Sequence, residues 1–132
     1  MKTSTAVIGV AFAITAGLAA ISYAQQPGFS RKMLQDQNMS ISDRHAVQVL
    51  AEFAPGGAAG KHTHPGEELG YIVEGSLQLE VDGQPPRTLK AGDVFFIPAG
   101  TVHDGKNLGS GPAKVLATYV VEVGKPVASP AK

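Results

Sequence analysis

Two separate stretches of this sequence contain side chains that could bind one metal ion together. His62, His64 and Glu68 lie close to one another in the chain, and His103 lies 35 residues after Glu68. Three imidazoles and one carboxylate suit a divalent first-row transition metal. The sequence therefore predicts one such ion in the domain, and manganese, iron, nickel, copper and zinc are all compatible with these ligands.

The local sequence indicates how these side chains could converge. Residues two apart on a β-strand point to the same face, so His62 and His64 could contact the same ion. A Pro65-Gly66 turn could return Glu68 toward them. His103 must then come from a distant strand, directed inward by the bend that precedes it.

Each of these residues also has an ordinary structural interpretation. His62 and His64 could be exposed loop residues after a glycine-rich stretch, and Glu68 could be a surface acid. Glu67 competes with Glu68 for the ligand position, but the spacing favours Glu68 and leaves Glu67 as a solvated side chain. His45 begins a strand outside both stretches and is not assigned to the site. The combination of all four residues favours the metal site over a coincidence.

Apolar and polar residues alternate along several segments, a pattern typical of half-buried β-strands. The clearest segments are residues 47–53, 77–81, 94–97 and 115–123. Segment 69–74 carries apolar residues on both faces, so one face could pack on the core and the other on a partner. No segment has a helical period of apolar residues, and the sequence therefore predicts an all-β fold.

The spacing within both stretches matches the two signature motifs of the cupin family. The matching positions are Gly56, His62, His64, Glu68 and Gly75 in the first motif, and Gly92, Pro98, Gly100, His103 and Asn107 in the second. Over about residues 46–123 the sequence resembles a small single-domain cupin. The resemblance implies a small antiparallel β-barrel, or double-stranded β-helix, in which His62, His64, Glu68 and His103 bind the metal. It also implies a small-molecule ligand and a homodimer, and it leaves the reaction open.

Composition divides the chain into four segments. They are a signal peptide (1–24), an N-terminal arm (25–44), a cupin barrel domain (45–123) and a flexible C-terminal tail (124–132). The arm is polar, and residues 31–34 could add an edge strand to the barrel. The tail contains Pro126 and Pro130, which favour an irregular conformation.

The signal peptide is predicted from the order of residue types in segment 1–24. Lys2 precedes an apolar run of 16 residues, and Ser22 and Ala24 are small residues at the positions that a signal peptidase reads. The run is too short to span a bilayer core, which disfavours the alternative of an uncleaved membrane anchor. The sequence therefore predicts cleavage after Ala24 and a secreted or periplasmic protein without a stable membrane span.

The charge and cysteine content restrict the partners. Segment 1–24 contains one of the 11 basic residues, Lys2, and none of the 11 acidic residues, so the mature form has a formal charge of about −1. That charge argues against nucleic acid or an anionic membrane as a partner. The chain has no cysteine, so stability must come from the barrel core, the metal and an interface between subunits.

Outside the four ligands, the sequence contains no Ser-His-Asp set, phosphate-binding glycine loop or paired acids at catalytic spacing. The metal would therefore supply the chemistry, acting on a small, partly apolar organic molecule. Leu77, Leu79, one of Phe95 and Phe96, and Tyr119 could line the pocket. Tyr119 could donate a hydrogen bond there, although core packing is favoured for it.

Three functions follow for such a site. The favoured one is an oxidoreductase that resembles cupin dioxygenases. The others are a non-redox isomerase or decarboxylase, and a protein that binds a metal or small ligand without turnover. A metal site is necessary for the first two functions but does not by itself distinguish them from the third.

Overall fold

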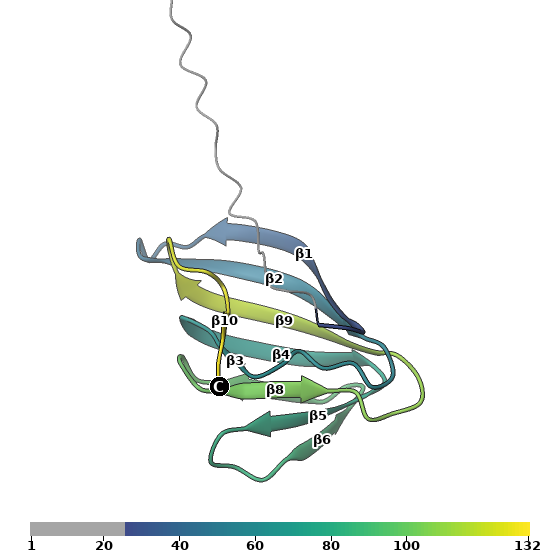
Figure 1. Ribbon diagram of the computed structural model, residues 1–132. Helices are drawn as coiled ribbons and strands as arrows, with labels where there is room; N and C mark the ends of the chain where they lie inside the picture. Colours follow the sequence, from purple (N-terminus) through teal and green to yellow (C-terminus); the bar gives the residue numbers. More distant parts are fainter. Residues whose placement is uncertain (1–25) are drawn as a thin grey trace, which may run out of the picture.

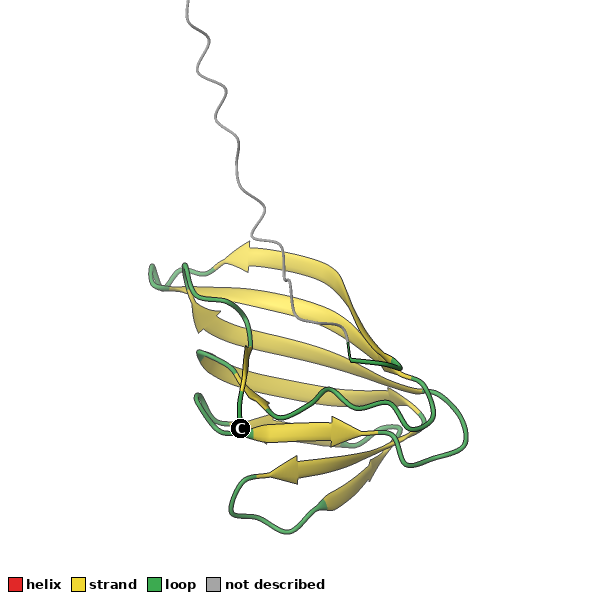
Figure 2. Cartoon of the chain, viewed as in Figure 1, coloured by secondary structure: helices red, strands yellow, loops and turns green. Residues whose placement is uncertain are grey.

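Ten β-strands form two five-stranded antiparallel sheets in residues 26–132, the part of the chain that this computed structural model describes (Figure 1). The first sheet contains, in spatial order, β1 (Phe29–Asn38), β2 (Arg44–Phe53), β9 (Ala113–Glu122), β4 (Gly66–Glu74) and β7 (Val94–Ile97). The second contains β10 (Ser129–Pro130), β3 (His62–Thr63), β8 (His103–Lys106), β5 (Ser76–Val81) and β6 (Arg87–Lys90). The described residues are strands and loops (Figure 2), so the predicted all-β antiparallel fold is confirmed.

Residues 26–132 contain no helix that is long and apolar enough to cross a membrane. The predicted signal peptide, residues 1–24, and its cleavage site lie outside the described residues. Cleavage and export therefore stay predictions.

Alternating burial along the strands produces the core between the two sheets. Along β9 every second residue, from Ala113 to Val121, is buried, and the residues between them are partly exposed. The strands β2 and β5 alternate in the same way. Successive side chains of a strand point to opposite faces, so one face of each sheet is apolar. The two apolar faces meet and bury a single cluster that includes Val47 of the first sheet and Leu79 of the second.

The strand β7 shows which of two adjacent phenylalanines faces the interior. Phe95 is 8% exposed, whereas Phe96 is 55% exposed. A Cβ atom placed on Gly70 of the neighbouring β4 would lie 2.1 Å from the ring of Phe95. Gly70 therefore provides the space that allows Phe95 to pack in the core.

The arm predicted for residues 25–44 forms an edge strand of the first sheet. β1 pairs with β2 from Phe29, opposite Phe53, to Asn38, opposite His45. The rings of Phe29 and Phe53 lie 4.7 Å apart, and both belong to the core. The edge strand expected at residues 31–34 is therefore present, and it is longer than expected. The barrel also begins before residue 45, because β1 contributes to its core.

The C-terminal segment is the one predicted as a flexible tail, residues 124–132. It leaves β9 and runs to the edge of the second sheet, where β10 pairs with β3 (Figure 1). Ala128 is 2% exposed, and the backbone N–H of Ala131 donates a hydrogen bond to the carbonyl oxygen of Lys61. Pro130 is compatible with this pairing because an edge strand does not need every N–H group. The structure thus pairs part of this segment with the barrel, and its flexibility stays a prediction.

The outward face of the first sheet carries a group of exposed apolar side chains. This outer apolar patch consists of Leu69, Tyr71 and Val73 on β4 and of Val94 and Phe96 on β7, with exposed fractions of 46–68%. The two strands pair directly, with Leu69 opposite Phe96 and Tyr71 opposite Val94. Both faces of β4 are therefore partly apolar, as the sequence indicates.

Candidate metal centre

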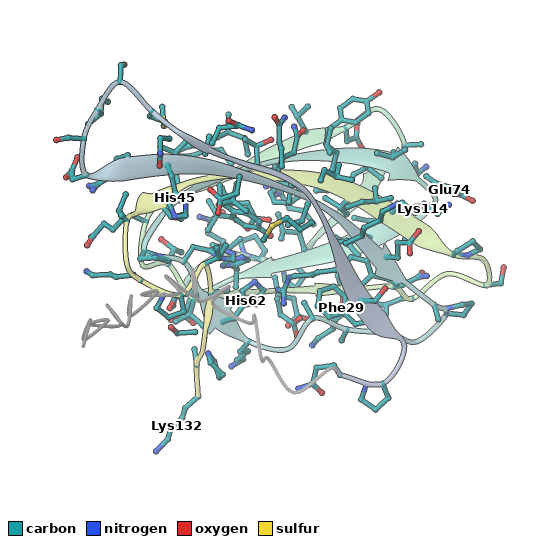
Figure 3. The ribbon with its side chains drawn as sticks, turned by 90° about the horizontal axis from the view of Figure 1, so that it is seen from above. Phe29, His45, His62, Glu74, Lys114 and Lys132 are labelled. Atoms are coloured by element: carbon teal, nitrogen blue, oxygen red, sulfur yellow. The ribbon has the colours of Figure 1, made fainter. Side chains whose placement is uncertain are left out.

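Four buried side chains meet inside the barrel. His62, His64, Glu68 and His103 are each at most 7% exposed, and their ligand atoms all lie within 4.8 Å of one another. In Figure 3, His62 lies near the middle of the fold, among the side chains of the barrel. The structure therefore brings together all four side chains that the sequence predicts as ligands, in a group that could hold a metal ion.

Both sheets contribute to this group. In the second sheet, His62 on β3 lies directly opposite His103 on β8, and their ring centroids are 4.2 Å apart. Glu68 reaches the same point from β4 of the first sheet. The bend before His103 is also attached to the first motif, because the backbone N–H of Gly100 donates to the carbonyl oxygen of His64 at 2.9 Å. The two motifs are therefore held together by backbone contacts as well as by their side chains.

Glu68 is the centre of the short contacts within the group. Its Oε2 atom lies 2.9 Å from Nε2 of His103 and 3.1 Å from Nε2 of His64. The Nε2 atom of His64 is buried but is not aligned with any hydrogen-bond partner. A buried polar atom without a partner is costly. A cation shared with Glu68 would provide that partner, so these residues fit a bound metal ion.

The other ring nitrogen of each histidine is bonded to the backbone. Nδ1 of His62 donates to the carbonyl oxygen of Gly60 at 2.6 Å, and Nδ1 of His103 donates to that of Thr101 at 2.9 Å. Nδ1 of the third histidine, His64, donates at 2.7 Å to a carbonyl oxygen of the C-terminal segment, that of Val127. Such bonds fix the ring orientation and direct the lone pair of Nε2 toward a metal. All three imidazole rings are thus oriented to bind a metal through Nε2.

The environment favours the metal-binding protonation states of two of these residues. Burial, the neighbouring charge of His103 and smaller effects lower the pKa of His62 to about 3. Burial alone would raise the pKa of Glu68, but its short contacts with His103 and His64 lower it to about 2. Near neutral pH, His62 is therefore uncharged and Glu68 is a carboxylate, which are the forms that bind a cation.

A small cavity of about 30 Å³ adjoins the candidate metal centre. Its apolar lining includes Leu77, Leu79 and Phe95. The sequence predicts the two leucines and leaves the choice between Phe95 and Phe96 open. Tyr119 also lines the cavity, and its ring lies 4.5 Å from that of His64. The hydroxyl group of Tyr119 interacts with Arg31 and Glu68, and burial together with the charge of Glu68 raises its pKa. Tyr119 is therefore a neutral hydrogen-bonding group beside the site, and it also packs in the core.

The remaining polar candidates lie elsewhere. Glu67 is partly exposed and its neighbour Glu68 is buried, as the spacing predicts. His45 forms a pair with Asp36 of β1, with 2.6 Å between Nδ1 and a carboxylate oxygen, and is not part of the group. Asn107 is buried, and its side chain bonds to backbone atoms of Phe53, Gly109 and Gly111, so its role is structural.

Sequence reasoning missed two contributors to the site. Arg31 lines the cavity from β1, and its position could have been found because it has the same parity as the buried Phe29. Val127 contributes only a backbone oxygen, which no side-chain pattern can indicate. Arg31 belongs to the segment that the sequence predicts as an N-terminal arm, and Val127 belongs to the segment that it predicts as a C-terminal tail.

The comparisons with known proteins agree with this fold. The family described as Cupin domain (Cupin_2) matches residues 49–119 of the chain, which include all four members of the group. The chain belongs to the cupin family. A germin-like protein of Arabidopsis thaliana (subfamily 2 member 2) is 40% identical to this cupin over 73 residues, which are 52% of the chain and 33% of the relative. The cupin thus spans about a third of the length of this curated relative.

Solved structures also resemble this cupin. DMSP lyase DddQ from Ruegeria pomeroyi DSS-3 has a TM-score of 0.65 and 24% identity, covering 78% of this chain and 51% of that one. KdgF from Halomonas sp. has a TM-score of 0.58 and 26% identity, covering 71% of this chain and 80% of that one. At such identities the likeness supports the shared fold and not a shared reaction.

Proposed function

We propose that this cupin binds one divalent transition-metal ion through His62, His64, Glu68 and His103, and that it is a metal-dependent enzyme acting on a small organic molecule. The observation that supports the proposal most strongly is the convergence of these four buried side chains. The three Nδ1 atoms are already bonded to backbone oxygens, so little reorganisation is needed to bind an ion. Oxidation by dioxygen is the favoured reaction.

When bound, iron, manganese, nickel or copper supplies redox chemistry with dioxygen, and zinc supplies Lewis-acid polarisation of a carbonyl group. The protein residues would bind and orient the substrate. Leu77, Leu79 and Phe95 give one side of the cavity an apolar surface that limits access of water. Tyr119 offers a neutral hydroxyl group, and no residue of the chain is assigned a proton-transfer role.

Metal analysis followed by oxygen uptake tests this proposal. The protein is purified from its native compartment, its metal content is determined, and it is then incubated with small organic acids and alcohols in an oxygen electrode. We expect about one transition-metal ion per chain and substrate-dependent oxygen uptake. Product formation without oxygen would instead identify an isomerase or decarboxylase. Metal or ligand binding without any product would identify a binding protein, and absence of a transition metal would contradict the proposal.

We also propose that the mature protein is secreted or periplasmic and forms a homodimer. The order of residue types in segment 1–24 supports export. The outer apolar patch supports self-association, because exposed apolar surface of this kind often marks an interface. The formal charge of the mature form gives no support for a nucleic-acid partner.

A further inference from the structure

A permanent cation lies beside the candidate metal centre. Arg31 on β1 lines the same cavity as His62, Glu68 and His103. It faces inward because it has the same parity as Phe29 and pairs with the buried Ala51 of β2. Its guanidinium carbon lies 4.6 Å from the centroid of the Phe29 ring, a distance at which a cation and an aromatic face attract each other.

Arg31 also interacts with the polar side of the site. It forms a hydrogen bond with the hydroxyl group of Tyr119, and that hydroxyl group also interacts with the carboxylate of Glu68. A guanidinium carries five N–H donors, so it can bind more than one partner at a time. Arg31 is therefore linked to the polar side of the centre through Tyr119.

The charge balance of the cavity changes when a divalent cation binds. When all three histidines are uncharged, as metal ligands must be, the positive charge of Arg31 and the negative charge of Glu68 cancel. A divalent cation adds two positive charges to a site whose other walls include Leu77, Leu79 and Phe95. Uncompensated charge in apolar surroundings is unfavourable. The metal-loaded cavity therefore favours an anion as its next ligand.

The shape of the guanidinium and the size of the cavity limit which anion fits. A planar guanidinium matches a carboxylate, with two parallel N–H···O bonds. The cavity is small, at about 30 Å³. A ligand with few heavy atoms is therefore favoured over a sugar, a nucleotide or a long-chain acid.

We propose that Arg31 determines specificity by binding the carboxylate of a small organic acid in this cavity, next to the metal-loaded centre. The inference rests on the proposed function, because it assumes that the four ligands hold a divalent cation. It adds a substrate class, short-chain carboxylates, and a residue outside both cupin motifs. It also predicts an order of binding in which the cation precedes the acid.

Calorimetric titration with acetate and with acetamide tests the inference without requiring turnover. These two probes have similar shapes, but only acetate is charged. Zinc, which is redox-inert, is titrated first into the wild-type protein, Arg31→Gln and Arg31→Lys. Arg44→Gln is the matched control, because Arg44 forms a surface pair with Asp43 outside the cavity.

We expect the zinc-loaded wild-type protein to bind acetate at least about tenfold more tightly than acetamide, and more tightly than the metal-free protein does. Losing one charge-assisted partner should weaken acetate binding about ten- to a hundredfold in Arg31→Gln. Arg31→Lys keeps the charge but lacks the planar guanidinium, so its affinity for acetate should lie between those of wild type and Arg31→Gln. Arg44→Gln should bind acetate with the affinity of wild type.

Two results would overturn the inference. Equal affinity of wild type for acetate and acetamide would do so whether or not the variants fold. Unchanged acetate affinity in zinc-loaded Arg31→Gln would show that Arg31 only supports Tyr119 and the barrel. In both cases intact zinc binding would leave the proposed metal site standing, whereas failure of wild type to bind zinc would overturn both claims.

Discussion

Nδ1 of His64 donates a 2.7 Å hydrogen bond to the carbonyl oxygen of Val127, which lies 63 residues later in the chain. The C-terminal segment therefore orients one of the four candidate ligands. The same segment buries Ala128 and pairs β10 with β3, the strand that carries His62. Metal binding in this cupin should consequently depend on a part of the chain that lies beyond both motifs.

Truncation after Gly124 should weaken metal binding. The truncated protein lacks the oxygen that orients His64, and loss of such a supporting bond typically costs about 10–100-fold in metal affinity. Zinc titration of full-length and truncated protein measures the effect. Removal of Lys132 alone is the control, because the backbone bond of Ala131 is kept. Equal affinities of the full-length protein and the Gly124 truncation would contradict this role of the tail.

Acid should destabilise the metal-free protein through His62 and Glu68. The pKa of His62 falls from 6.5 to about 3 on folding, and that of Glu68 falls from 4.5 to about 2. The unfolded chain therefore takes up both protons at a higher pH than the folded protein does. The free energy of unfolding should decrease as the pH falls from 6.5 toward 3 through His62, and from 4.5 toward 2 through Glu68.

Urea unfolding at a series of pH values, in the presence of a chelator, measures this dependence. His62→Gln cannot take up the proton, so its free energy of unfolding should vary less with pH between the ordinary histidine and glutamate pKa values. If the free energy of unfolding changes equally with pH in wild type and His62→Gln over that range, the assignment of a lowered pKa to His62 is wrong.

The outer apolar patch should mediate dimerisation. Placing a charge at its centre by Phe96→Glu should produce a monomer, because a buried unpaired carboxylate is unfavourable at an interface. Ile41→Glu is the matched control, since Ile41 and Phe96 are both 55% exposed but Ile41 is not part of the patch. Light scattering should give a dimer for wild type and Ile41→Glu. A monodisperse wild-type monomer at micromolar concentration would rule out this interface.

Export should produce a mature protein that begins at Gln25. The expectation rests on Lys2, the apolar run after it and the small residues Ser22 and Ala24. Intact-mass measurement of protein recovered from outside the cytoplasm checks it. A mass that includes residues 1–24 would exclude cleavage and support a membrane anchor instead.

The fold class and the convergence of the site residues could be predicted from sequence because they depend on local patterns. Strand alternation identifies most of the first sheet, and strand and turn geometry accounts for the spacing of His62, His64 and Glu68. His103 is distant in the chain, and its selection depends on the match to the second cupin motif. The structure brings these four side chains together. The sequence thus contained enough information to select the candidate ligands.

The contributions of the two chain ends could not be predicted in the same way. The bond from His64 to Val127 depends on where β10 pairs with β3, and its acceptor is a backbone atom that any residue would provide. Prolines in the tail suggested flexibility, yet Pro130 is accommodated at a sheet edge. Arg31 stands in a polar arm, and only the pairing of β1 with β2 shows that it faces the cavity.

Metal titration of single-residue variants tests the central claim most directly. His62→Ala, His64→Ala, Glu68→Ala and His103→Ala should each reduce zinc affinity by at least about tenfold and should reduce the thermal stabilisation that zinc provides. His45→Ala should bind zinc as wild type does, because its ring pairs with Asp36 outside the group. Equal losses in His45→Ala and His103→Ala, or undiminished binding in His103→Ala, would contradict the assignment of the metal centre.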